Sequence, residues 1–256
     1  MSPPTKQDYL YFLIFLLLFA FSLDLKASNN PFLQNKSLFE DQADHSLEDS
    51  KAVLIVLDAS GSMADPAVGA NSKMLLAKQV LESVLSKISP DVEVGLRVYG
   101  STRNGGDPVV ACQDSVLLVP PGRGNRRQIV NSLRELKPTG ATPISYAMRR
   151  AVEDLRGIST DKKSVVLISD GLDTCGFDPC SLARSFSDTG VKVQFNVVGF
   201  GISDDPAAQN QLQCIAANTD GKFYAADTAS ELTESLTDGF QYFNKNVTGQ
   251  IQEIKK

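Results

Sequence analysis

The sequence contains no tryptophan and a single histidine, His45, among its 256 residues. One imidazole excludes metal sites built on several histidines, and it leaves very little room for Ser-His-Asp or Cys-His catalysis. An excess of basic residues is also missing, because 25 Lys and Arg residues stand against 30 Asp and Glu residues. Proteins that bind nucleic-acid phosphates usually carry the opposite sign of charge. The composition therefore argues against histidine chemistry and against nucleic acid as a partner.

Residues 9–23 form an apolar, aromatic-rich run without a charged side chain. At about 1.5 Å per residue, this run is shorter than the roughly 30 Å of hydrocarbon that a spanning helix must cross. Residues 1–27 are therefore predicted to be a secretory signal peptide, with an uncleaved N-terminal anchor as the alternative. Either interpretation predicts an exported protein, located in the periplasm, in the cell envelope or outside the cell. Membrane association would involve residues 9–23 only.

The remaining chain divides into three parts by composition. Residues 28–50 are polar and acidic with little periodicity, which is typical of a solvated linker, and His45 lies in this segment. Apolar patterns typical of strands and helices alternate from residue 51 to residue 243 and predict one folded domain. Residues 244–256 are expected to form a C-terminal tail.

Within the folded part, residues 53–57 are continuously apolar, as expected for a strand covered on both faces. No helical pattern separates the strands predicted at 92–98 and 115–119, so we expect these two to form an antiparallel pair at the sheet edge. Further strands are predicted at 165–169, 191–197 and 222–225, with helices at 74–88, 129–136, 144–155, 182–186 and 212–216 and from 232 onward. The pattern predicts a three-layer, doubly wound α/β fold with a mostly parallel six-stranded sheet and one antiparallel edge strand.

Three helix starts are marked by a capping side chain that precedes a proline. They are Thr142-Pro143, Asp178-Pro179 and Asp205-Pro206. Each pair predicts a helix whose first residue is the proline.

The first apolar strand runs directly into the loop Asp58-Ala59-Ser60-Gly61-Ser62. Open parallel sheets bind their ligands beyond the carboxyl ends of the strands, so position alone marks this loop as a candidate site. Its carboxylate and two hydroxyls are hard oxygen ligands suited to Mg²⁺, Mn²⁺ or Ca²⁺. Asp170 ends another apolar strand and adds a second carboxylate, while Thr142 offers a hydroxyl ahead of a predicted helix.

These motifs together resemble the metal-ion-dependent adhesion site of von Willebrand factor type A domains. The match consists of DxSxS at 58–62, TGATP at 139–143 and SDG at 169–171. The resemblance extends from about Lys51 to Phe243 in the family's order of elements. Three further stretches look like exported bacterial members of the family: GLRVYG at 95–100, PPGRGN at 120–125 and DTCGFDPC at 173–180.

The resemblance implies a strand order of 3-2-1-4-5-6, with Asp58 and Asp170 on neighbouring central strands. It also implies that Ser60 and Ser62 bind a divalent cation directly, Thr142 directly or through water, and the two aspartates mainly through water and hydrogen bonds. A cation with so little direct carboxylate contact stays electron-poor, and an Asp or Glu of a partner protein can fill its open coordination position. The implied function is a non-enzymatic adhesion or scaffold module that uses Mg²⁺, or else Mn²⁺ or Ca²⁺.

Two other functions remain open at this point. Asp58 at a strand end could be the nucleophile of a metal-assisted hydrolase or phosphotransferase, although position 60 is Ser where such an enzyme would want a second carboxylate. The domain could also be purely structural, with no ligand.

Cys112, Cys175, Cys180 and Cys214 all follow the predicted export signal, so they are expected to form disulfides. Four cysteines allow three pairings. Cys175 could bridge Cys180, or Cys112 could pair with Cys175 while Cys180 pairs with Cys214, and the sequence does not choose.

Three other acids near the predicted site are expected to be solvated and not to bind the metal: Asp65, Asp107 and Asp173. Five arginines could steer an acidic partner toward the site, although we expect them to belong to a surface of mixed charge. They are Arg97, Arg103, Arg123, Arg126 and Arg127.

Overall fold

The computed structural model of the chain describes residues 51–67, 71–102, 107–160 and 162–245. A six-stranded sheet in the order β3-β2-β1-β4-β5-β6 forms its centre, as the family resemblance implied. The β2–β3 pair is antiparallel, and every other pair of neighbouring strands is parallel. The strands are β1 (Lys51–Asp58), β2 (Val92–Tyr99), β3 (Ser115–Gly122), β4 (Lys162–Ser169), β5 (Gln194–Phe200) and β6 (Phe223–Ala226).

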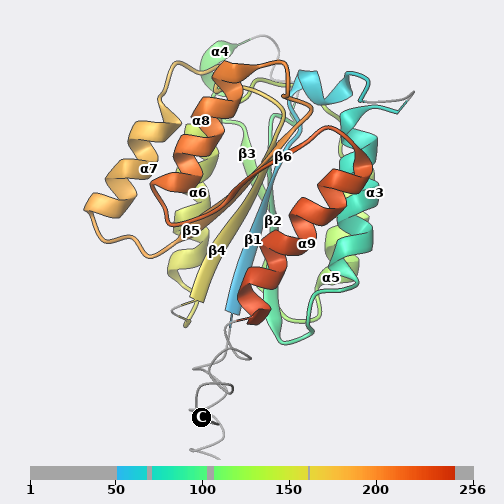
Figure 1. Cartoon of the computed structure of the whole chain (residues 1–256), viewed down its shortest axis with the longest axis vertical. Helices are drawn as coiled ribbons and strands as arrows, with labels where there is room; N and C mark the ends of the chain where they lie inside the picture. The colour runs from blue at the N-terminus through green and yellow to red at the C-terminus, as the bar shows by residue number, and fades with distance from the viewer. Residues whose placement is uncertain (1–50, 68–70, 103–106, 161, 246–256) are drawn as a thin grey trace, which may run out of the picture. The chain divides into compact units, whose positions relative to one another are not determined.

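Helices cover both faces of the sheet and make the fold three layers deep (Figure 1). One face packs against α3 (Lys73–Leu85), α5 (Arg126–Glu135) and α9 (Ala229–Lys245). The other face packs against α6 (Ile144–Arg156), α7 (Pro179–Asp188) and α8 (Pro206–Ala217). The predicted fold class is confirmed.

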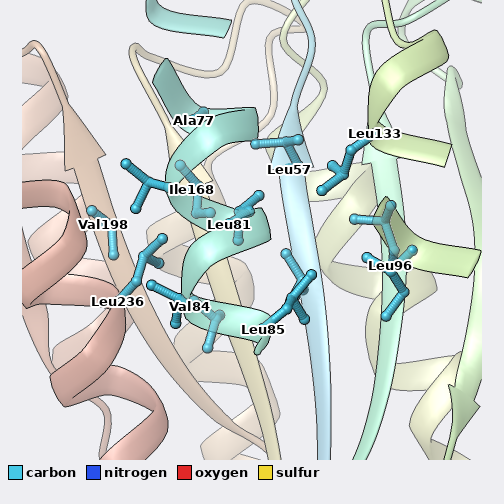
Figure 2. Packing of buried hydrophobic residues seen from close by; sticks show 14 of the residues in the cluster. Leu57, Ala77, Leu81, Val84, Leu85, Leu96, Leu133, Ile168, Val198 and Leu236 are labelled. Atoms are coloured by element: carbon cyan, nitrogen blue, oxygen red, sulfur yellow. The ribbon is translucent and has the colours of Figure 1, made fainter. Parts of the chain in front are cut away.

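Strand β1 shows how the sequence produces these layers. Successive side chains of a strand point to opposite faces, so Val53, Ile55 and Leu57 enter the core under α3, whereas Leu54 and Val56 enter the core under α6. Figure 2 shows the first of these cores, where side chains of α3 pack against the face of the sheet. Because both faces of the strand are covered, its residues 53–57 are continuously apolar.

The structure differs from the sequence-based predictions at several places, among them the start of β5, the loop after β2 and the start of α6. Strand β5 begins at Gln194, since the Val191 amide is used at the end of α7, where it donates to the carbonyl of Phe186. The polar loop after β2 contains a short helix, α4 (Pro108–Ala111), which the side chain of Asp107 caps. Helix α6 begins one residue late, at Ile144, with Pro143 at the N-cap position.

The capping predictions at Asp178 and Asp205 are confirmed, because each side chain accepts a hydrogen bond from the first turn of its helix. The capping role predicted for Thr142 is wrong. Instead, Oδ2 of Asp173 accepts a hydrogen bond of 2.8 Å from the amide of Ser145, in the first turn of α6. A carboxylate from a distant loop thus replaces the local cap and leaves the Thr142 hydroxyl available for another role.

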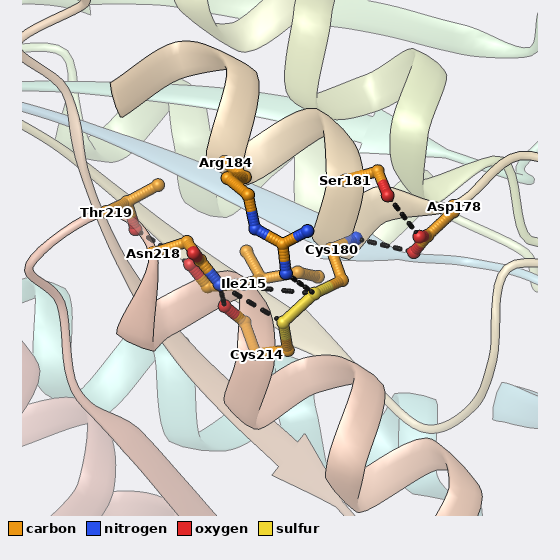
Figure 3. The surroundings of a disulfide bond; sticks show 8 residues. All are labelled: Asp178, Cys180, Ser181, Arg184, Cys214, Ile215, Asn218 and Thr219. Atoms are coloured by element: carbon orange, nitrogen blue, oxygen red, sulfur yellow. Dashed lines mark hydrogen bonds between the residues drawn. A yellow bond between two sulfur atoms is a disulfide. The ribbon is translucent and has the colours of Figure 1, made fainter. Parts of the chain in front are cut away.

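The cysteines form two disulfides, Cys112–Cys175 and Cys180–Cys214. The first links the end of α4 to the loop after β4, at the same end of the sheet as the β1 motif. The second links α7 to α8, where Asn218 donates to the sulfur of Cys214 at 3.1 Å (Figure 3). This pairing is one of the two that the sequence left open.

The predicted signal peptide or anchor at 1–27, the predicted linker at 28–50 and nearly all of the predicted tail at 244–256 lie outside the described residues. Among the residues that are described, no helix is long and apolar enough to cross a membrane.

Candidate metal centre

The five residues predicted to form the site come from three segments that meet at the carboxyl end of the sheet. Asp58 is the last residue of β1, and Asp170 directly follows the neighbouring strand β4. Ser60 and Ser62 lie at the start of a single turn of 3₁₀ helix, η1 (Gly61–Ala64). Thr142 belongs to the loop before α6. The structure therefore places both carboxylates and the serines at the point where the strand order reverses, which is the usual ligand position in such sheets.

The carboxylate of Asp58 is completely buried, and hydrogen bonds hold both of its oxygens. Oδ1 accepts from the amide of Ser60 at 2.7 Å, and Oδ2 accepts from the hydroxyls of Tyr99 and Ser169 at 2.7 and 2.8 Å. Burial and, to a smaller extent, the charge of Asp170 raise the pKa of Asp58 to about 6. The metal-free site thus holds a carboxylate that would gain from a nearby positive charge.

Short contacts link side-chain oxygens of Ser60, Ser62 and Asp170. The two serine hydroxyl oxygens are 3.1 Å apart, and the Ser62 hydroxyl donates to Oδ1 of Asp170 at 2.8 Å. Neighbouring ligands of an octahedral Mg²⁺ with bonds of 2.0–2.1 Å are about 3 Å apart, so the spacing fits this ion. Within the described residues, no three His, Cys, Asp or Glu side chains cluster to hold a metal ion. A cation at this place would therefore need hydroxyl ligands as well as carboxylates.

A lysine that the sequence analysis missed contacts the site. Nζ of Lys73, the first residue of α3, lies 2.9 Å from Oδ2 of Asp170. The Asp170 side chain is fully buried and the Lys73 side chain is 13% exposed, so the ion pair is shielded from solvent. Lys73 supplies the counter-charge of Asp170, while the other oxygen of that carboxylate faces Ser62.

Thr142 is fixed through its backbone rather than through its side chain. Its amide donates to the Thr174 hydroxyl at 2.9 Å, and its carbonyl accepts from the Thr174 amide at 3.1 Å. The residue is buried. Among the described residues, its own hydroxyl has no hydrogen-bond partner, so a cation ligand role is open to it.

Two glycines allow the loops of the site to approach one another. Gly100 has a φ of +69°, and a Cβ there would lie 2.5 Å from the carbonyl oxygen of Ala141 and 2.8 Å from the amide nitrogen of Ser60. A Cβ on Gly140 would lie 3.0 Å from backbone atoms of Gly100. Only glycine fits such a close contact between backbones. The GLRVYG and TGATP stretches thus form one wall of the site.

The expectations for Asp173, Arg97 and Arg126 are wrong. Arg126 is half-buried, and its guanidinium donates to the backbone carbonyls of Ser89 and Val92. Asp173 is not merely solvated, because it accepts hydrogen bonds from the amides of Ser145 and Cys175. Arg97 is not a surface group, because it is only 2% exposed and makes a two-pronged ion pair with Asp154.

Tyr99 and Ser169, which donate hydrogen bonds to Asp58, were also not predicted from the sequence, although each lies inside a motif that resembles the family.

Comparisons with known proteins identify the family of the chain. The model of the von Willebrand factor type A domain matches residues 53–172. The uncharacterized protein YwmC of Bacillus subtilis is 30% identical over 188 residues, which cover 72% of this chain and 81% of YwmC.

Two solved structures share the fold. The pilus adhesin SpaC from Lactobacillus rhamnosus GG superposes with a TM-score of 0.61 at 17% identity, over 77% of this chain and 31% of the adhesin. The chain thus spans about a third of that adhesin. Proximal thread matrix protein 1 from the mussel byssus, solved with a zinc-occupied MIDAS motif, superposes with a TM-score of 0.54 at 16% identity, over 77% of this chain and 46% of that protein. At these identities the likeness concerns the fold alone. The match to the family model and the similarity to YwmC show that the chain belongs to the von Willebrand factor type A domain family.

Proposed function

We propose that this domain binds a divalent cation, Mg²⁺ in the first place, through Asp58, Ser60, Ser62, Thr142 and Asp170. Mn²⁺ and Ca²⁺ are the alternative ions for the same oxygen ligands. The observation that carries the proposal is a pair of short oxygen–oxygen contacts at the ends of β1 and β4, 3.1 Å from Ser60 to Ser62 and 2.8 Å from Ser62 to Asp170. The mussel protein, which shares this fold, was solved with zinc in its metal-ion-dependent adhesion site (MIDAS), and this supports cation binding by the present domain.

The bound cation would in turn bind an acidic residue of a partner protein. The cation would supply positive charge and a vacant ligand position. A carboxylate carries the opposite charge and can fill that position. Both oxygens of Asp58 accept hydrogen bonds within the protein, and Asp170 is paired with Lys73. The two aspartates would therefore leave part of the positive charge of the cation unneutralised. This arrangement supports an adhesion or scaffold role.

We include export in the proposal. The two disulfides fit an oxidising compartment, and the apolar run at 9–23 would direct the chain to it. No observation favours the hydrolase or phosphotransferase. Asp58 is fully buried and both of its oxygens accept hydrogen bonds, which supports a role beside a cation over a role as nucleophile.

Thermal unfolding tests the cation site directly. Protein freed of metal with EDTA is heated with and without millimolar Mg²⁺, Mn²⁺ or Ca²⁺, and the melting temperature is expected to rise because a ligand of the native state stabilises it. The double variant Ser60→Ala with Ser62→Ala should lose the rise. The matched control is Ser83→Ala with Ser187→Ala, which removes two exposed hydroxyls on α3 and α7. An unchanged melting temperature of the natural protein with all three ions would refute the proposal.

Peptide selection tests the partner chemistry. A random peptide library is selected for binding in Mg²⁺ and eluted with EDTA. The selected peptides should share an Asp or Glu whose replacement by Asn or Gln abolishes binding. Metal-dependent binding by peptides without any carboxylate would contradict this part of the proposal.

A further inference from the structure

A groove lies beside the candidate metal centre, and it has no role in the site described above. It has a volume of 410 Å³ and is lined by Val109, Tyr146, Arg149, Phe177 and the Cys112–Cys175 disulfide, among others. We call it the rim groove. This volume lies within the range of sites that bind ligands or short peptide segments.

The rim groove exposes apolar side chains that most domains would bury. Val109 is 67% exposed and Phe177 is 54% exposed. Five large hydrophobic side chains are exposed among the described residues, and three of them, Val109, Val110 and Phe177, belong to α4 or to the loop that the disulfide ties to α4. A concentration of exposed apolar surface marks an interaction site more often than scattered residues do.

Arg149 provides a fixed positive charge in the groove. Its guanidinium lies over two aromatic rings, 6.0 Å from the centre of Tyr146 and 5.6 Å from the centre of Phe177. Among the described residues, it has no ion pair or hydrogen bond. Because the two rings hold the guanidinium, its N–H groups are preorganised to receive a carboxylate in a two-pronged geometry.

The groove and the candidate metal centre are joined by short, rigid connections. Thr174, which makes two hydrogen bonds to Thr142, directly precedes the disulfide-bonded Cys175. Tyr146 and Arg149 lie on the first turns of α6, which begins just after Thr142. At about 1.5 Å per helical residue, Arg149 lies about 8 Å along the axis of α6 from its first residue, Ile144, which is two residues after Thr142. This distance is close to the span of two to three residues of an extended peptide.

We propose that the rim groove binds an extended segment of the partner protein that carries two acidic residues about three positions apart, with an apolar residue between them. This proposal rests on the proposed function, since the first carboxylate fills the open position of the cation. The apolar side chain packs between Val109 and Phe177, and the second carboxylate pairs with Arg149. The metal centre alone would accept any exposed acid, whereas the groove selects the sequence around it.

The test uses peptides selected from the random library for Mg²⁺-dependent binding. Their affinity is measured for the natural protein, Arg149→Gln and Phe177→Ser, together with the control Arg150→Gln, whose side chain pairs with Glu153 instead. Each groove variant should weaken binding by about tenfold or more, the size usual for a central arginine or aromatic contact. The control should bind normally. The rise in melting temperature with Mg²⁺ should persist in all three variants, because none of them alters a proposed metal ligand.

The outcomes separate this proposal from the proposed function. If none of Mg²⁺, Mn²⁺ and Ca²⁺ raises the melting temperature of the natural protein, the cation site itself fails. If Mg²⁺ does so and the peptides bind the groove variants as tightly as the natural protein, the groove proposal alone is refuted. Selected peptides with a single acid and no recurring apolar residue would also refute it. A dimer of the free protein that Phe177→Ser dissociates on size exclusion would assign the groove to a second copy of the chain and overturn the proposal.

Discussion

Replacing Asp58 by Asn should stabilise the metal-free domain, even though Asp58 lies at the centre of the candidate site. In the metal-free protein, burial and the charge of Asp170 raise the pKa of Asp58 from 3.8 to about 6. A shift of this size amounts to about 3 kcal/mol of unfavourable free energy at neutral pH, because the native state must hold the charge that the unfolded chain holds in water. Asn carries no charge. Its amide oxygen can still accept from Ser60, and its amide nitrogen can donate to the hydroxyls of Tyr99 or Ser169.

The expected gain for metal-free Asp58→Asn is up to about 3 kcal/mol at neutral pH, or roughly 6–12 °C in melting temperature for a domain of this size. The rise on adding Mg²⁺ should disappear, since the negative charge that favours the cation is gone. A carboxyl with a raised pKa stabilises the fold only while protonated, so the natural protein loses this contribution as the pH rises from about 4 to about 6. The difference between variant and natural protein should therefore vanish near pH 4.

Urea unfolding in EDTA, at several pH values, measures this difference. The matched control is Asp65→Asn, an exposed aspartate that follows η1, and it should change neither stability nor the response to Mg²⁺. An Asp58→Asn variant that is less stable than the natural protein in EDTA at pH 7.5 would refute the argument that the buried charge is costly. A retained Mg²⁺ response would show that Asp58 plays no part in cation binding.

Three other substitutions test the surroundings of the site by the same measurements. Lys73→Met leaves Asp170 without its counter-charge, so the metal-free protein should lose about 3 kcal/mol, while Mg²⁺ should raise its melting temperature by more than in the natural protein. An unchanged metal-free stability would contradict the role of this ion pair. Arg97→Met breaks the buried pair with Asp154 and should cost about 3–5 kcal/mol without reducing the response to Mg²⁺. Gly100→Ala should cost more than about 1 kcal/mol and weaken that response, since its Cβ would meet a carbonyl oxygen at 2.5 Å; an alanine variant as stable as the natural protein would contradict the close approach.

The sequence was sufficient for features whose determinants are local. The apolar run at 53–57 and the DxSxS motif after it belong to one strand and its loop. The position of the motif at the carboxyl end of the sheet therefore followed from the pattern. The strand order did not follow from any local pattern and came from the family resemblance. The disulfide pairing could not be predicted, because Cys175 has possible partners both nearby in sequence and 63 residues away.

Features missed by the sequence analysis depend on contacts between distant segments. Lys73 and Asp170 are 97 residues apart, and nothing in the helical pattern of α3 marks its first residue as the counter-ion of a strand-end carboxylate. Thr142 carries a capping signal of ordinary form, yet Asp173 supplies the cap from another loop. The local capping signal at Thr142 did not determine the structure, because the carboxylate of Asp173 accepts the hydrogen bond instead.

The charges around the site explain how one arrangement could both stay folded without metal and bind an acidic partner with it. Asp58, Asp170 and Lys73 are the charged side chains linked through the candidate site, and together they carry −1 at neutral pH. A divalent cation would change that sum from −1 to +1. The metal-free site would therefore repel an acidic segment, and the loaded site would attract one. Without Lys73 the same cation would only neutralise the two aspartates. The lysine thus makes the affinity for an acidic partner depend on the metal, and Lys73→Met should reduce that affinity even as it strengthens the binding of the cation.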